Sequence, residues 1–151
     1  MSQRDPIRVF VTHVWEQTDD YLRVFEYLES ARNFYYRNCS TPELPPAQTS
    51  QEALRENLRQ QIAAAEVVVA LASLYPQHYD MLLFQLNYAK ASDKPTILLQ
   101  HFGREQPVAA AISPLVDESV SWDERALVDT IKRQARHEET TRWDTIEFKL
   151  D

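Results

Sequence analysis

Glycine is almost absent from this chain of 151 residues, since Gly103 is the only one. One glycine cannot supply the GxGxxG turn of classical dinucleotide-binding domains or the glycine-rich loop of P-loop proteins, so the sequence excludes both. Cysteine is equally scarce. Cys39 alone can form no internal disulfide and no Cys-rich zinc site, and we expect it to be a buried or half-buried small apolar residue.

Long apolar runs and clustered positive charge are also missing. No apolar run approaches the roughly 18 residues of a membrane helix, and the start, MSQRDPIRVFV, lacks the features of a secretory signal. We therefore expect a cytoplasmic protein without a membrane partner. Acidic side chains outnumber basic ones by 23 to 16, giving a net charge of -7. Because this balance repels phosphate backbones, and the densest basic patch (132–137) is followed by acids on an expected helix, we expect no nucleic-acid partner.

Two kinds of catalytic centre lack their signatures. The four histidines show no close ligand spacing of the HExxH kind, so we expect no metal site. A Ser/His/Asp triad is compatible with the composition, but no GxSxG elbow is present, which disfavours hydrolase chemistry of that type.

Strand and helix patterns alternate along the whole chain. Apolar or β-branched runs predict strands at 7–12, 33–38, 67–72, 95–100 and 119–121. Helical spacing predicts helices that begin near residues 18, 49, 76 and 123. This alternation predicts a single α/β domain over residues 1–151, with a central, mostly parallel sheet of about five strands and helices on both faces. Residues 139–151 are expected to form a C-terminal extension that adds an edge strand or docks on the body.

Local signals predict how three of the helices begin. Thr18 is expected to cap the first helix, with Leu22 among its inward-facing residues. Capping boxes pair Thr49 with Glu52 and Ser121 with Glu124, which predicts the starts of the second and fourth helices.

Polar and aromatic residues follow the expected strands. In parallel open sheets ligands bind at the carboxyl ends of the strands, which here carry residues 12–15, 38–40, 73–75 and 101–103. This concentration favours a stacking pocket for a planar base, although packing is the commoner role for any single aromatic residue. The segment 38–49, with three prolines, is longer than most connections, so we expect it to be a gate over this pocket rather than an inert surface strap.

Four segments together resemble bacterial TIR-like domains. RVFVTHVWEQTDDYLRVFEYLES resembles their first strand, Ser-His-x-Trp element and first helix, and FYYRNCSTPELPP resembles their aromatic strand and proline-rich loop. AAAEVVVALASLY and YDMLLFQLNYAKASDKPTILLQHFG are similar to the central strand junction and to the helix that normally carries a glutamate. The resemblance covers about residues 7–103 and implies a flavodoxin-like (TIR) three-layer fold. Thr12 stands where serine is commoner, and Met81 or Leu82 stands in place of a tryptophan.

The resemblance implies an enzyme that cleaves NAD+ between nicotinamide and ribose. Members of this kind resemble the signal-producing proteins of Thoeris anti-phage defence, in which an effector protein reads an ADP-ribose-derived product. NAD+ would be the substrate, no further cofactor is implied, and TIR–TIR contacts would form a homo-oligomer. Gln85 falls on the catalytic glutamate position. The residues expected to line the substrate pocket are Phe10, Thr12, His13, Trp15, Tyr36, Asn38 and Tyr79.

Glutamine at the catalytic position leaves alternatives open. A carboxylate stabilises the positive charge that develops on the ribose, whereas an amide does not, at an expected cost of about 10² to 10³ in rate. We therefore expect an enzyme that is inactive or traps its substrate, and the alternative is a non-catalytic TIR adaptor that acts by homotypic association. A third alternative makes Gln85 an ordinary exposed helix residue. A receiver-like phosphorylation domain is disfavoured, because no acid ends the third strand.

Overall fold

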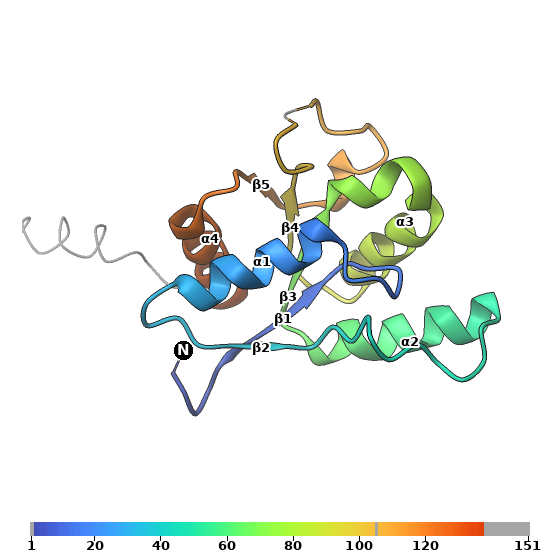
Figure 1. The fold of residues 1–151 in the computed structure, drawn as a ribbon, viewed down its shortest axis with the longest axis horizontal. Coiled ribbons are helices and arrows are strands. Elements are labelled where there is room, and N and C mark those ends of the chain that lie inside the picture. The colour runs from blue at the N-terminus through green and yellow to red at the C-terminus, as the bar shows by residue number, and fades with distance from the viewer. Residues whose placement is uncertain (1, 105, 138–151) are drawn as a thin grey trace, which may run out of the picture.

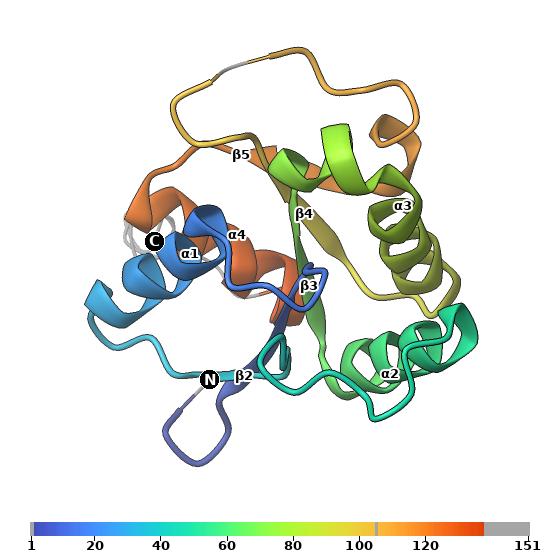
Figure 2. The same ribbon diagram turned by 45° about the vertical axis from the view of Figure 1, so that its right-hand side comes forward.

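The computed structural model describes residues 2–104 and 106–137, and over them the chain forms a three-layer α/β structure (Figure 1). Five strands form one parallel sheet in the order β2-β1-β3-β4-β5. Helices α1 and α4 cover one face of this sheet, and α2 and α3 cover the other (Figures 1 and 2). The predicted α/β, flavodoxin-like architecture is therefore confirmed.

The strands match the expected runs to within a few residues. Their bounds are β1 (Ile7–Val11), β2 (Tyr36–Asn38), β3 (Val67–Leu71), β4 (Thr96–Leu99) and β5 (Glu118–Val120). Every residue of β3 and β4 is buried, as expected of central parallel strands that helices cover on both faces. Phe10 of β1 pairs with Val68 of β3, so the expected central strand lies directly beside the first one.

The four helices within residues 2–104 and 106–137 also follow the predicted pattern. Their bounds are α1 (Asp19–Ser30), α2 (Gln51–Ala64), α3 (Tyr75–Ala91) and α4 (Glu124–Arg136), with short 3-10 turns η1 (Ala72–Leu74) and η2 (Ser113–Leu115). Helix α3 is kinked at His78, whose φ of -133° and ψ of 38° are not helical. The expected C-terminal extension, 139–151, lies outside the described residues.

Two of the predicted helix caps are wrong by one or two residues. Ser50, not Thr49, caps α2, because its hydroxyl accepts a hydrogen bond from the amide of Ala53. Asp123, not Ser121, caps α4, because its carboxylate accepts a 2.8 Å bond from Ala126 N.

The inward face of α1 also differs from the prediction. Thr18 caps the helix as expected, its hydroxyl accepting from Tyr21 N. The buried apolar residues are Tyr21, Val24 and Leu28, whereas Leu22 is 43% exposed. Leu22 therefore lies outside the apolar stripe that packs on the sheet.

Alternate residues of β1 enter two separate apolar cores. Ile7, Val9 and Val11 join the larger core, which includes residues of α1 and α4. Phe10 joins the smaller core with Leu58 and Ile62 of α2 and Ala89 of α3. The period of two along the strand thus fixes which helix pair each side chain meets.

Candidate functional site

Thr12 extends the hydrogen bonding between β1 and β3 past the end of β1. Its amide donates a 3.0 Å hydrogen bond to Val69 O, and its hydroxyl accepts one of 2.9 Å from Leu71 N. Thr12 is fully buried, so its hydroxyl extends the pairing of the two strands beyond Val11. This geometry assigns the Thr12 hydroxyl to the protein backbone.

Gln85 of α3 holds the next peptide of this loop. Its Oε1 accepts a 3.2 Å bond from His13 N, and its Nε2 donates 2.9 Å to His13 O and 3.1 Å to Met81 O. The side chain is 0% exposed, so Gln85 is not an ordinary exposed helix residue. A carboxylate could accept the first bond but could donate neither of the other two.

His13 lies between two loops and α2. Its Nδ1 accepts a 3.0 Å bond from Trp15 N, which leaves the proton on Nε2, and Nε2 lies 2.8 Å from Gln61 Oε1. The same Gln61 oxygen accepts a 2.9 Å bond from Thr41 N in the proline-rich loop. Burial lowers the pKa of His13, while the Gln61 bond and the nearby Glu43 carboxylate act in the opposite direction.

Trp15 takes a conformation that is unusual for a bulky residue. Its φ is 61°, in the left-handed region, which costs free energy for a side chain of this size. Two bonds hold it there: its amide to His13, and its indole Nε1 to Asn57 Oδ1 at 3.2 Å. Gln61 Nε2 donates 2.7 Å to the same Asn57 oxygen, which closes a ring of polar contacts.

Asn38 belongs to a second polar group beside the first. Its Nδ2 donates a 3.0 Å bond to the Tyr21 hydroxyl, and its Oδ1 accepts a 2.9 Å bond from Ser40 N. The Ser40 hydroxyl lies 3.0 Å from that of Tyr21, whose ring meets the His13 ring edge-on at 6.5 Å. Burial raises the pKa of Tyr21, which keeps the phenol neutral as this network requires.

The remaining predicted pocket residues are placed differently. Phe10 packs in the smaller core, with its ring centroid 5.7 Å from that of His13. Tyr36 pairs with Ile7 at the amino end of the sheet and stacks on Phe34, away from the polar ring. Tyr79 is 52% exposed on α3. The structure therefore brings together Thr12, His13, Trp15, Asn38 and Gln85, with Phe10 behind them, and it does not join Tyr36 or Tyr79 to this group.

Three residues of the network were missed from the sequence. Asn57 and Gln61 lie one turn apart on α2, and Gln61 falls on the apolar side of that helix three residues after Leu58. The signal available in the sequence was a polar residue, Gln61, at a position of α2 that otherwise faces the core. Tyr21, one residue before the expected Leu22, could be read only as a core aromatic.

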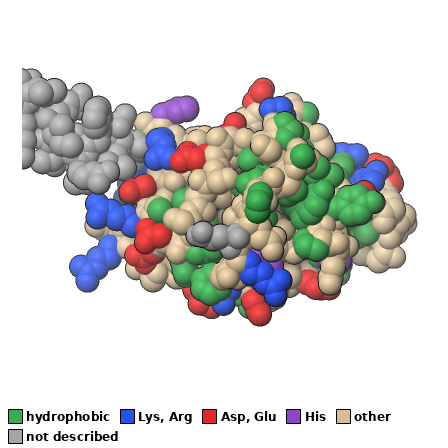
Figure 3. Space-filling model, turned by 90° about the horizontal axis from the view of Figure 1, so that it is seen from above, with side chains coloured by type: hydrophobic (Ala, Val, Ile, Leu, Met, Phe, Trp, Pro, Cys, Tyr) green, Lys and Arg blue, Asp and Glu red, His purple; other side chains and the backbone are tan. Residues whose placement is uncertain are grey.

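The cavities found in the described part of the chain include two at other places on the sheet. A small apolar hollow of about 80 Å³ lies beyond β3 and β4, lined in part by Tyr75, Leu98 and Val108. Seen from above, hydrophobic side chains gather on the side of α3 (Figure 3). A larger cleft of about 570 Å³ lies at the opposite, amino edge of the sheet, between Lys90, Asp117 and His137.

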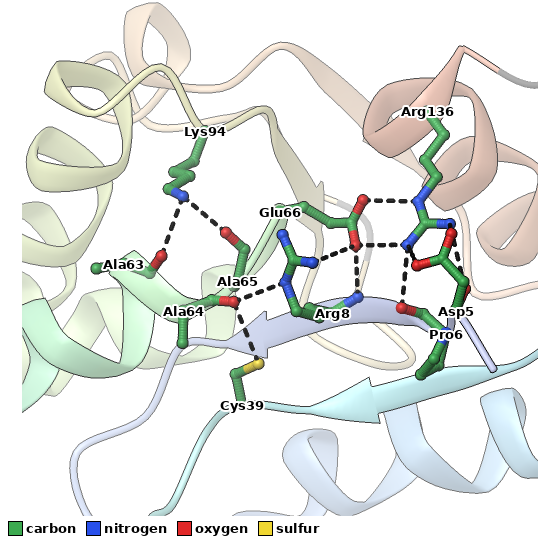
Figure 4. Close-up of polar contacts among 10 residues, drawn as sticks. All are labelled: Asp5, Pro6, Arg8, Cys39, Ala63, Ala64, Ala65, Glu66, Lys94 and Arg136. Atoms are coloured by element: carbon green, nitrogen blue, oxygen red, sulfur yellow. Dashed lines mark hydrogen bonds and ion pairs between the residues drawn. The ribbon is translucent and has the colours of Figure 1, made fainter. Parts of the chain in front are cut away.

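Beside this cleft a polar cluster ties together four segments (Figure 4). We call it the Arg136 cluster: Arg136, Glu66, Asp5, Pro6 and Arg8. The Arg136 guanidinium donates to both carboxylate oxygens of Glu66, at 2.8 and 2.9 Å, to both of Asp5, and to Pro6 O. Glu66 also accepts a 3.0 Å bond from Arg8 N, and Arg136 lowers the pKa of the Glu66 carboxyl.

Two further features bear on the class of site. Within residues 2–104 and 106–137, no group of three or more His, Cys, Asp or Glu side chains is placed to hold a metal ion. In the same part of the chain, no helix has the length and apolar character needed to cross a membrane.

Comparisons with known proteins bear on the fold of this chain and give no information on its function. No protein-family model matches the chain, and no curated protein matches it. A solved structure of a conserved protein from Enterococcus faecalis V583 is similar, with a TM-score of 0.60 at 14% identity over 85% of this chain and 99% of that one. A 3-dehydroquinate dehydratase-like protein from Bifidobacterium longum has a TM-score of 0.44 at 13% identity, over 89% and 96% of the two chains. The first likeness supports the three-layer fold.

Proposed function

We propose that this chain is a non-catalytic TIR-like module that acts by association with other proteins, including further copies of itself. The observation that carries this proposal is the Gln85 amide. All three of its hydrogen bonds go to backbone groups, and two of them require a donor. At this position the side chain supports the loop after β1 and supplies neither charge nor an open contact to a substrate.

Exposed apolar side chains support association. Leu44 in the proline-rich loop is 63% exposed, and Tyr79 and Phe102 are 52% and 39% exposed. Each of these side chains offers apolar area that a protein partner could cover.

A second candidate is the NAD+-cleaving enzyme that the resemblance implies, producing an ADP-ribose-derived signal for an effector protein in anti-phage defence. It is supported by the convergence of Thr12, His13, Trp15 and Asn38 beside Gln85 at the end of β1. In that case the network is the closed state of a gated site, and the proline-rich loop would open before NAD+ enters.

Nicotinamide release measured by chromatography separates the two candidates. The chain as it stands and its Gln85→Glu variant are incubated with NAD+, and a thermal melt confirms that each is folded at the assay temperature. The module proposal predicts no release from either protein and concentration-dependent self-association in sedimentation. Release by the folded Gln85→Glu variant would overturn it in favour of the enzyme.

A further inference from the structure

One imidazole connects the two loops that border the end of β1. His13 Nδ1 accepts the Trp15 amide of the β1–α1 loop, and Nε2 contacts the Gln61 oxygen that also accepts the Thr41 amide of the proline-rich loop. These four residues, His13, Trp15, Gln61 and Thr41, are here named the latch. His13 is only 1% exposed, so water cannot replace either of its bonds while the latch is closed.

The latch depends on one protonation state of His13. A neutral imidazole has one acceptor nitrogen and one donor nitrogen, and the latch uses both. A second proton would occupy Nδ1 and face the Trp15 N–H, so that two donors would oppose each other. Trp15 would then lose the bond that helps to hold its left-handed backbone, at a φ of 61°.

We propose that the latch is a pH-sensitive switch, in which proton uptake at His13 Nδ1 breaks the bond to the Trp15 amide and releases the β1–α1 loop, while the bond from Nε2 to Gln61 persists. The released segment is the one that carries Trp15, and Thr41 of the proline-rich loop keeps its bond to Gln61. The switch does not depend on the proposed function, since it governs loop opening whether the opened surface meets a protein or a nucleotide.

The surroundings of His13 favour the neutral imidazole when the latch is closed. They also place a carboxylate near the imidazolium that forms when the latch opens. Helix α1 contributes the Tyr21 ring, and α2 and α3 contribute the uncharged amides of Gln61 and Gln85. Glu43 of the proline-rich loop is the nearby carboxylate, and its attraction opposes the lowering of the His13 pKa by burial. An opened, hydrated site removes that burial, so protonation and opening favour each other.

Nitrogen-15 NMR of the full chain tests the switch. The His13 ring nitrogens are titrated from pH 8 downward, and hydrogen exchange of the Trp15 and Thr41 amides is followed, corrected for the intrinsic pH dependence of exchange. If opening takes up one proton, protection of the Trp15 amide falls about tenfold per pH unit across the window between the closed and open His13 pKa values. The Thr41 amide, bonded to Gln61, and the Leu71 amide, bonded to Thr12 within the sheet, are expected to keep their protection.

Three variants sharpen this test. His13→Asn retains an acceptor for the Trp15 amide but cannot be protonated, so the pH response of that amide is expected to vanish. Glu43→Gln is expected to move the response to lower pH, and His101→Asn, at another strand end, to leave it unchanged. If His13→Asn fails to fold, the titration of the unaltered chain still decides the question. The proposal is overturned if His13 titrates while the Trp15 amide stays protected, or if His13 stays neutral until the whole chain unfolds.

Discussion

Gln85 completes a set of hydrogen bonds that requires an amide, so exchanging it for an acid of equal size has a definite expected cost. In Gln85→Glu the carboxylate would face the carbonyls of His13 and Met81 at full burial. We expect a loss of about 3–5 kcal/mol in the free energy of unfolding at neutral pH. Burial beside carbonyls raises the pKa of an introduced carboxyl, so the loss should shrink as pH falls and the acid becomes protonated and can donate.

Asn87→Asp is the matched control for this prediction. It makes the same amide-to-acid change two residues later on an exposed position of α3, where the side chain donates to Leu83 O. We expect a change within about 0.5 kcal/mol, as for most surface substitutions. Urea unfolding of both variants at pH 5 and pH 8 measures the difference. Equal destabilisation of the two would contradict the role assigned to the Gln85 amide.

At the scale of single residues, the sequence predicted which residues lie near one another but not the hydrogen bonds between them. It placed Thr12, His13 and Trp15 beside one another at the end of β1, and Gln85 on the correct helix. The direction of the Gln85 amide depends on how α3 lies against the β1–α1 loop, 72 residues away in the chain. Periodicity reports which face of a helix is buried, and it contains no information on which distant peptide that face will meet.

Among the helices, the start of α2 offers a direct test, because two adjacent hydroxyl residues compete for the cap. Ser50 accepts from Ala53 N in the structure. Ser50→Ala is expected to lower the free energy of unfolding by about 1 kcal/mol, as caps typically do. Thr49→Ala is expected to change it by only a few tenths of that amount. The two values come from thermal or urea unfolding, and a larger loss at Thr49 would restore the cap that the sequence predicted.

The elements themselves were predictable, and their ends were less so. Unbroken apolar runs gave β3 and β4, and helical spacing gave α2, because burial on one or both faces leaves a repeating signal in the sequence. A capping box is a weaker signal, since Thr49 and Ser50 both offer a hydroxyl at the start of α2. The choice between them is made by the backbone that enters the helix, whose path follows from the whole proline-rich loop.

For the molecule as a whole, the Arg136 cluster predicts a stability that depends on acid pH. The bond to Arg136 lowers the pKa of the Glu66 carboxyl below its ordinary value of 4.5 in the folded chain. The resulting stabilisation is fully present above 4.5 and is lost as pH falls through the lower, folded-state value. Arg136→Gln should therefore cost about 1–3 kcal/mol at pH 7 and progressively less below pH 4.

Arg133→Gln serves as the control for this change. Arg133 lies one turn earlier on α4 and pairs with Glu118 at a more exposed position, 47% against 17% for the Arg136 side chain. We expect this substitution to cost less than about 1 kcal/mol. Calorimetric unfolding between pH 3 and pH 7 measures both variants. An Arg136→Gln penalty that is independent of pH over this range would show that Glu66 is not the partner that matters.

The architecture was the most predictable property of the molecule. Alternating strands and helices allow few arrangements besides a parallel sheet covered on both faces, and the structure has that form. The larger cleft at the amino edge was not foreseen, because its lining comes from three separate turns and helix ends. Such a surface leaves no period or motif in the sequence.

The Arg136 cluster also determines how the structure would respond to mechanical load. It joins Asp5 and Pro6, just ahead of β1, directly to the last turn of α4. A pull applied between these two segments would load the guanidinium contacts first and leave the strand ladders unstressed until those contacts part. Because the contacts are few and centred on one side chain, they would break one after another. The fold should therefore yield at a lower force along this axis than under shear along its strands.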